Sequence, residues 1–173
     1  MFRRVTMAVL LATLPWALVG CDETTESDSS EEATFTFSPD PAVAAESTDG
    51  RTYTILGDDT HADQVIKYPW KTRFTVTMEE TGGVGRDITS MSIRVQQASA
   101  GVVITPTNSE VERYDYQSQT NGNRLEAKGK TSVTFDVWYD LPNDGREALI
   151  TVTFSYIDDD DLSFSESAQV QVH

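Results

Sequence analysis

The chain has 173 residues and a formal net charge of −15 at pH 7, with 28 acidic residues against 13 basic ones. This length suits one domain with one hydrophobic core, and the negative charge excludes nucleic acid as a partner and disfavours flat adsorption on anionic lipid. Because Cys21 is the only cysteine, no intrachain disulfide can form and an ordinary apolar core has to stabilise the fold.

The first segment of the chain has the three regions of a secretory signal peptide. Arg3 and Arg4 precede an apolar run over residues 5–18, and a small residue stands directly before Cys21. The run is shorter than the roughly 20 residues that span a bilayer, so a cleaved signal peptide over residues 1–20 is favoured over a permanent transmembrane helix. Loss of the two arginines with it changes the charge of the mature chain from −15 to −17.

The motif LVGC at residues 18–21 resembles the lipobox of bacterial lipoproteins. In that family the cysteine sulfur receives a diacylglycerol, the chain is cleaved before the cysteine, and the new amino group is usually acylated too. The resemblance implies a covalent lipid on Cys21 and a domain anchored to a membrane of the bacterial cell envelope, facing the periplasm or the exterior. Two or three acyl chains give a stable anchor, because each buried methylene contributes about 0.8 kcal/mol. Secretion with a free thiol is the alternative.

An acidic run, DETTESDSSEE at residues 22–32, follows the cysteine and contains no apolar residue. Such a segment has nothing to bury against the entropy cost of ordering it. We therefore predict a disordered tether over residues 21–33, followed by one domain over residues 34–173. Asp22 resembles the inner-membrane retention signal of enteric-type lipoproteins, but the leaflet stays open.

From residue 34 onward, apolar and polar residues alternate in short runs, which is the pattern of half-buried β-strands. The predicted strand residues, in chain order, are Phe35 and Phe37; Tyr53 and Ile55; Phe74, Val76 and Met78; Met91, Ile93 and Val95; Val102 to Ile104; Glu110 to Gln117; Val133, Phe135, Val137 and Tyr139; Ile150, Val152, Phe154 and Tyr156; and Phe164, Ala168, Val170 and Val172. Turn residues separate these runs at 82–83, 106–108, 121–123, 142–145 and 158–161. About seven to nine antiparallel strands in two sheets packed face to face are expected.

Three segments resemble bacterial immunoglobulin-like domains: FTVTMEETGGVGRDITSMSIRV at 74–95, EAKGKTSVTFDVWYD at 126–140 and REALITVTFSYIDDDD at 146–161. The resemblance implies an all-β, immunoglobulin-like antiparallel sandwich without the disulfide of antibody domains. It indicates an architecture and no particular activity.

Motifs for catalysis are missing. The mature chain offers His61 and His173 as bases, has no G-x-S-x-G sequence and keeps no free thiol once Cys21 is lipidated. The glycine-rich stretch 82–85 lacks the G-K-[ST] of a phosphate loop, and we interpret it as a hairpin turn. The sequence therefore predicts no enzyme.

Two acidic runs are candidate cation sites: Asp58, Asp59, His61 and Asp63 in the first, and Asp158, Asp159, Asp160 and Asp161 in the second. Calcium takes six to eight oxygen ligands, often from loop carboxylates, but neither run has the D-x-[DN]-x-[DN]-G pattern. Turn formation by aspartate is the main interpretation. Calcium at either run, or a transition metal at His61, is the alternative. No other cofactor is expected.

Trp138 stands between Val137 and Tyr139 and points away from the core if these neighbours point into it. One alternative is that Trp138 packs under a loop or against an aromatic of a neighbouring strand, such as Tyr114 or Tyr116. The other is that these aromatic residues form an exposed patch that contacts a protein or a glycan.

Together these features predict a membrane-anchored exported lipoprotein that displays a non-catalytic immunoglobulin-like interaction or structural module, with an unknown protein or glycan as partner. A ligand-binding module for Ca²⁺, glycan or peptide is the alternative function.

Overall fold

The computed structural model describes residues 33–105 and 112–173. The predicted signal peptide, Cys21 and nearly all of the predicted tether lie outside the described residues, as do the turn predicted at 106–108 and the first residues of the strand predicted from Glu110. Ala33, the last residue of the predicted tether, is described and is buried. No helix within the two described ranges is long and apolar enough to cross a membrane.

The described residues form twelve β-strands and one short 3-10 turn, so the all-β prediction is confirmed. The elements are β1 (Thr34–Ser38), β2 (Ala44–Glu46), β3 (Thr52–Ile55), β4 (Gln64–Lys67), β5 (Trp70–Glu79), β6 (Arg86–Ser99), β7 (Val102–Val103), β8 (Arg113–Thr120), β9 (Arg124–Leu125), β10 (Lys130–Asp140), η1 (Pro142–Asp144), β11 (Ala148–Asp158) and β12 (Ser163–Val172).

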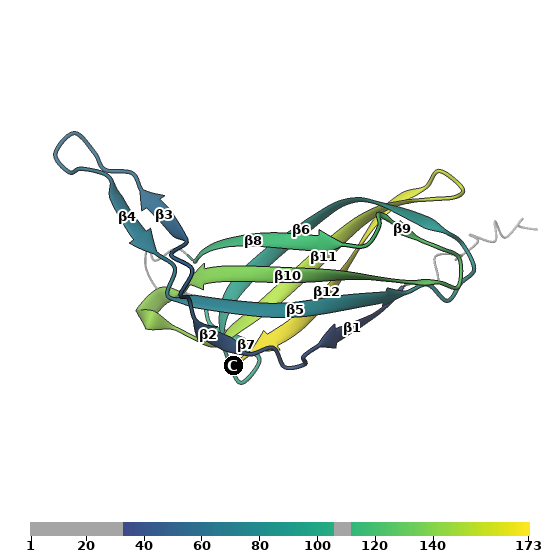
Figure 1. The fold of residues 1–173 in the computed structure, drawn as a ribbon, viewed down its shortest axis with the longest axis horizontal. Coiled ribbons are helices and arrows are strands. Elements are labelled where there is room, and N and C mark those ends of the chain that lie inside the picture. Colours follow the sequence, from purple (N-terminus) through teal and green to yellow (C-terminus); the bar gives the residue numbers. More distant parts are fainter. Residues whose placement is uncertain (1–32, 106–111) are drawn as a thin grey trace, which may run out of the picture.

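Two antiparallel sheets lie face to face (Figure 1). The first sheet has the strand order β1-β5-β10-β8, and β2 also pairs with β5. The second has the order β12-β11-β6-β7, and β9 also pairs with β6. The long strands are those predicted from alternation, and the run predicted at Val102 to Ile104 forms the short β7, while β2 and β9 are too short to produce a periodic pattern.

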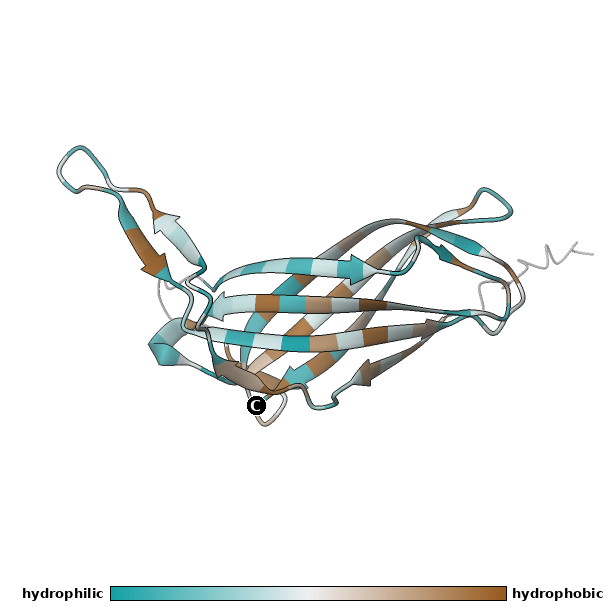
Figure 2. Cartoon of the chain, in the orientation of Figure 1, coloured by the Kyte–Doolittle hydropathy of each residue, from teal (hydrophilic) through white to brown (hydrophobic). Residues whose placement is uncertain are grey.

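The core lies between the two sheets and contains the side chains that alternation had placed there. The residues Phe74, Val76, Phe135, Val137, Ile150, Val152 and Phe154 are each at most 1% exposed and belong to one buried cluster. The rings of Phe135 in β10 and Phe154 in β11 lie 6.3 Å apart, centroid to centroid, and join the two sheets. Coloured by hydropathy, the strands of both sheets alternate along their length (Figure 2).

The strand predicted around Tyr53 and Ile55 forms, but it does not belong to the sandwich. Among residues 33–105 and 112–173, β3 and β4 pair only with each other and make a separate two-stranded hairpin, which projects from one end of the molecule (Figure 1). We call residues 52–67 the arm. Alternation predicts which side chains share a face of a strand, but it does not say which sheet the strand joins.

The prediction of a hairpin turn at Gly82-Gly83 is wrong, because β5 and β6 lie in different sheets. The glycine pair connects the two sheets across one end of the sandwich. Two consecutive strands with alternating residues can bury their apolar faces against the same core from opposite sides, so adjacency in sequence does not require pairing. Gly83 adopts a φ of 95°, a conformation that favours glycine.

The register of β1 on β5 defines two ends of the sandwich. At one end of β5, Thr34 pairs with Glu79. At the other end, β5 begins at Trp70, which two residues connect to the arm. At about 3.3 Å per residue, β5 separates these ends by roughly 30 Å. We call them the Ala33 end and the arm end.

Candidate functional site

The first acidic run forms the loop at the tip of the arm. The Oδ1 atom of Asp58 accepts hydrogen bonds from the backbone N–H groups of Thr60 and His61, at 2.8 and 2.9 Å. Asp63 Oδ1 accepts the backbone N–H of Gly57 at 2.8 Å. The hydrogen bonds with Thr60 and His61 lower the pKa of Asp58 to about 2. These carboxylates therefore hold the loop closed.

The second acidic run forms the turn between β11 and β12. Asp158 Oδ1 accepts the backbone N–H groups of Asp160 and Leu162, and Asp159 makes an ion pair with Arg124 at 2.8 Å. Turn formation, the main interpretation of this run, matches the geometry.

Within residues 33–105 and 112–173, no three acidic, histidine or cysteine side chains converge as they would around a metal ion. The alternative of a cation at Asp58, Asp59, His61 and Asp63, or at Asp158, Asp159, Asp160 and Asp161, is therefore not carried further. In both loops, the carboxylates of Asp58, Asp63 and Asp158 accept hydrogen bonds from backbone N–H groups of their own loop.

Trp138 points away from the core and is 4% exposed, so the alternative that it packs under a loop is confirmed and the alternative of an exposed contact patch at this residue is wrong. Its indole Nε1–H donates a hydrogen bond to Asp49 Oδ2 at 2.7 Å. The cationic groups of Arg51 and Lys71 lie 4.2 and 4.4 Å from the ring centroid, close enough for cation–π attraction. The segment that leads into the arm covers this tryptophan.

The two tyrosines named with Trp138 are not its partners. Trp138 pairs with Asp115, whereas Tyr114 and Tyr116 pair with its neighbours Tyr139 and Val137 and so lie on the opposite face of the sheet. Tyr116 is half-buried, and its hydroxyl donates to the carbonyl oxygen of Met91 at 3.1 Å. Tyr114 is 36% exposed and alone of the three is accessible to a partner.

Polar contacts fasten the base of the arm to the first sheet, and we call them the latch. Arg51 Nε contacts Asp115 Oδ2 at 2.7 Å, beside the cation–π contact with Trp138. The hydroxyl of Tyr53 donates to Asp140 Oδ2 at 2.6 Å. The latch therefore connects the arm to both β8 and β10.

The latch also shifts the acidity of its members. Partial burial raises the pKa of Asp49, but hydrogen bonds from Trp138 and Lys71 outweigh it and lower the pKa to about 2. Burial, together with the hydrogen bond to Asp140, raises the pKa of Tyr53 to about 12. At neutral pH, Asp49 is therefore ionised and accepts the hydrogen bond from Trp138, and Tyr53 keeps the proton that it donates to Asp140.

Beyond the latch, no residue of the arm belongs to the buried hydrophobic cluster of the sandwich. Leu56 and Val65 are 79% and 69% exposed, and Tyr53, Ile55 and Ile66 are half-buried. Gly57 is required in the loop, because a Cβ there would collide with the backbone carbonyl of His61. The arm is thus a short ribbon with a closed tip and an incompletely covered surface.

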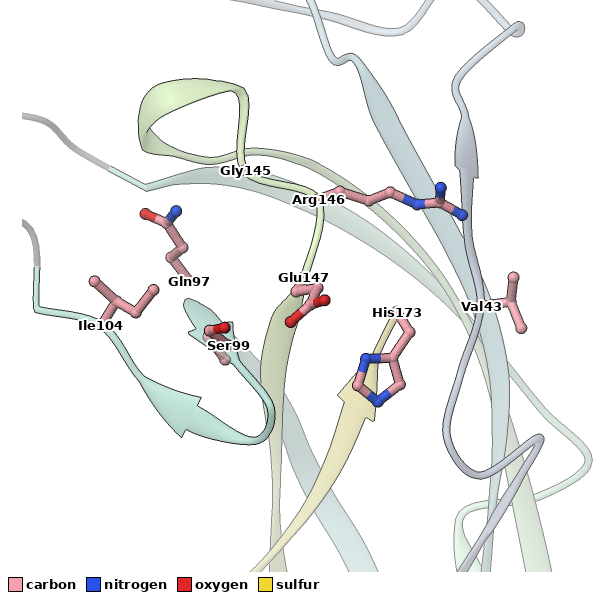
Figure 3. Close-up of a pocket in the computed structure, with 9 residues that line it drawn as sticks. Val43, Gln97, Ser99, Ile104, Gly145, Arg146, Glu147 and His173 are labelled. Atoms are coloured by element: carbon pink, nitrogen blue, oxygen red, sulfur yellow. The ribbon is translucent and has the colours of Figure 1, made fainter.

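A shallow hollow of about 620 Å³ lies at the arm end of the sandwich, beside η1 and β7 (Figure 3). Apolar Val43 and Ile104 line it together with polar side chains. Ser99, Glu147 and His173 also line it, but no hydrogen bond within the described part of the chain joins their side chains. A nucleophile needs its base within hydrogen-bond reach, and these three side chains do not show that geometry in this structure.

The Ala33 end is built differently, around an ionic cluster in which Glu80 and Arg86 are buried and Glu166 is half-buried. The carboxylate of Glu80 accepts backbone N–H groups of Gly82, Gly83 and Lys128 at 2.7–2.8 Å. Burial raises the pKa of Glu80, but these hydrogen bonds outweigh it and lower the pKa overall.

Arg86 completes the cluster. Its guanidinium lies 3.0 Å from Glu166 Oε1 and 3.8 Å from Glu80 Oε1. The same oxygen of Glu166 accepts the backbone N–H of Ala33 at 3.0 Å. Both the connection between the sheets and the point where the chain enters the domain are therefore held by buried charges.

Exposed apolar side chains are distributed unevenly between the two ends. Most of the large ones in the described residues lie on the arm or at the arm end: Val43, Leu56, Val65, Val102, Val103, Ile104 and Tyr114. At the Ala33 end, only Ile157 and Leu162 of the described residues are in this class. Such concentrations mark contact surfaces more often than scattered single residues do.

The sequence analysis missed the arm, the latch and the ionic cluster, because each depends on residues far apart in the chain. Asp49 and Trp138, for example, are 89 residues apart. The run at 102–104 was correctly predicted to form a strand, β7, but its exposure was not predicted. No known family model matches the chain, and no curated protein or solved structure matches it significantly.

Proposed function

We propose that this chain is an exported bacterial lipoprotein that is anchored through a lipid on Cys21 and displays a non-catalytic immunoglobulin-like interaction module in the cell envelope. Support for the anchor comes from the LVGC motif after a charged and then apolar segment, followed by an acidic stretch with no apolar residue. The partner is a protein that contacts the arm end.

The observation that carries this proposal is the difference between the two ends of the domain. The chain enters at the Ala33 end, which is closed by buried charges, and the exposed apolar side chains gather about 30 Å away at the arm end. A tether from Cys21 to Ala33 directs the closed end toward the membrane. The arm end then faces away from the lipid, where a partner can reach it.

Strand order supports the immunoglobulin-like assignment. When the seven long strands β1, β5, β6, β8, β10, β11 and β12 are lettered A to G in chain order, the first sheet becomes A-B-E-D and the second becomes G-F-C. These are the strand orders of a constant-type immunoglobulin domain. The proposal of an interaction module agrees with this architecture, which carries many binding functions and no inherent catalysis.

The anchor is tested by growing cells with an alkyne-tagged fatty acid and isolating the protein. The wild-type chain should carry the label and partition into detergent, while Cys21→Ser should lose both properties. A matched control, Cys21→Ser with Ser29→Cys, keeps one thiol outside the motif and should stay unlabelled. Wild-type protein that is unlabelled and freely soluble would contradict the proposal.

A further inference from the structure

We propose that the outer edge of β4 binds an extended, lysine- or arginine-rich segment of a partner protein as an added strand. This inference rests on the proposed function, because it requires the arm end to be the end that faces a partner. Four observations carry it: the open strand edges, the position of the latch, the contacts that fix the base and tip of the arm, and the charge of the arm.

The strands of the arm have open edges. β3 and β4 pair in an antiparallel register from Thr52↔Lys67 to Ile55↔Gln64, and within the described residues neither pairs with any other strand. An outer edge of this kind presents backbone N–H and C=O groups that can pair with an incoming strand. A two-stranded ribbon is marginally stable on its own, and a third strand would stabilise it.

Of the two edges, β4 is the accessible one. The latch residues Asp49, Arg51 and Tyr53 lie in or before β3, and they hold that side of the arm against β8 and β10. Figure 1 draws β4 on the side of the arm away from the sandwich. Val65, in the middle of β4, is 69% exposed and provides an apolar contact beside the edge.

The arm is held in place before any partner binds. The latch fixes its base, the rings of Tyr53 and Tyr68 lie 5.0 Å apart, and the carboxylates of Asp58 and Asp63 close its tip. An edge whose base and tip are already fixed loses less conformational entropy when a strand is added, so even a short interface can bind measurably.

Charge determines the kind of segment that fits. The arm, residues 52–67, contains Asp58, Asp59 and Asp63 at its tip and one basic residue, Lys67 at the base of β4, so its formal charge is 1 − 3 = −2. A second copy of this acidic chain, an anionic lipid surface and a nucleic acid would all be repelled. An extended segment with alternating basic and aliphatic side chains complements both the carboxylates of the tip and the exposed Leu56 and Val65.

The test uses the purified full chain and a short synthetic peptide of alternating lysine and valine. Fluorescence anisotropy should detect binding that weakens with added salt, and a matched peptide of alternating glutamate and valine should not bind. Hydrogen exchange should slow at the amides of residues 64–67 when the lysine peptide is bound. Absence of binding, equal binding of both peptides, or protection confined to other strands would overturn the proposal.

Two pairs of variants locate the site. Val65→Lys should weaken binding of the lysine peptide about tenfold, whereas Leu162→Lys, at an exposed apolar residue of the opposite end, should not. Asp59→Lys should also weaken binding, whereas Asp160→Lys makes the same charge change in the other acidic turn and should have little effect. Equal losses within each pair would indicate non-specific attraction to the acidic domain and would overturn the proposal.

Other occupants of the edge would appear as distinct results. Dimers of the full chain that dissociate on Val65→Lys, or binding to vesicles of anionic phospholipid, would each contradict the proposed basic segment. Failure of the peptide experiment leaves the lipid anchor untouched, because the anchor is tested separately by labelling of Cys21.

Discussion

The two ends of this sandwich use polar residues in opposite ways. At the Ala33 end, Glu80 and Arg86 are almost fully buried, and their charges satisfy backbone groups and each other. At the arm end, Asp49 and Arg51 remain partly exposed and fasten the arm, while apolar side chains nearby face solvent. The buried charges of the Ala33 end therefore stabilise the fold, whereas the polar contacts of the arm end hold the arm and its exposed apolar side chains in position.

The largest effect is expected at the Ala33 end. Arg86→Ala should lower the free energy of unfolding by about 3–5 kcal/mol, because it leaves the buried carboxylate of Glu80 and the half-buried carboxylate of Glu166 without their cation. Chemical denaturation measures this loss. The exposed residue Arg94 on the same strand is the control, and Arg94→Ala should stay within about 0.5 kcal/mol of wild type. Similar losses in both variants would show that the ionic cluster does not stabilise this end.

A smaller and more local effect is expected at the latch. Trp138→Ala should cost about 2 kcal/mol, since it removes one buried aromatic side chain and the donor to Asp49, and the melting temperature should fall by several degrees. Amides of residues 52–67 should exchange faster than those of β5 and β10, because the arm loses its support. Tyr114→Ala, at a more exposed aromatic residue of the same sheet, serves as the comparison. Uniformly faster exchange would mean that Trp138 supports the whole fold.

The latch should also loosen in acid. The pKa of Asp49 is about 2 in the folded chain against 3.8 for a free aspartate, so its contribution is fully present above pH 3.8 and is lost as pH falls through about 2. The NMR signal of the Trp138 indole N–H should shift over this interval. Asp49→Asn should abolish the titration. Trp70, whose buried Nε1 has no hydrogen-bond partner among the described residues, reports global unfolding if it shifts at the same pH.

The smallest effect is expected at the exposed apolar residues of the arm. Leu56→Ser and Val65→Thr should each change the free energy of unfolding by less than about 0.5 kcal/mol, because both side chains already face solvent. Thermal melting checks this. A clear loss of stability would show that these side chains pack within the domain and would weaken the contrast between its two ends.

Much of the sandwich could be predicted because its signal is local. The alternation at Phe74, Val76 and Met78 identified both the strand and its buried face, since side chains on a strand alternate regardless of what lies beyond it. The same rule placed Trp138 on the outer face of its sheet. It could not predict which residues cover that face, because Asp49 and Arg51 are far from Trp138 in sequence and contact it only in the folded chain.

The candidate site was harder to predict for the same reason. Tyr53 and Ile55 alternate as core residues do, yet they lie in a projecting ribbon, and no residue near them in sequence distinguishes the two cases. The aspartates at 58–63 and 158–161 were assigned to turns correctly because such contacts span only a few residues. Glu80 and Glu166, which hold the Ala33 end, were indistinguishable in the sequence from solvated acidic residues.

The pairing of β1 and β2 with the same strand determines how a pull between Ala33 and the arm would be carried. From Ala33 to Glu46 the chain runs along β5 from one end of the sandwich to the other and then leads into the arm. Because its hydrogen bonds to β5 lie across the direction of such a pull, they would be loaded together in shear and not opened one by one. Mechanical tension would thus travel along this edge of the first sheet and bypass the aromatic core.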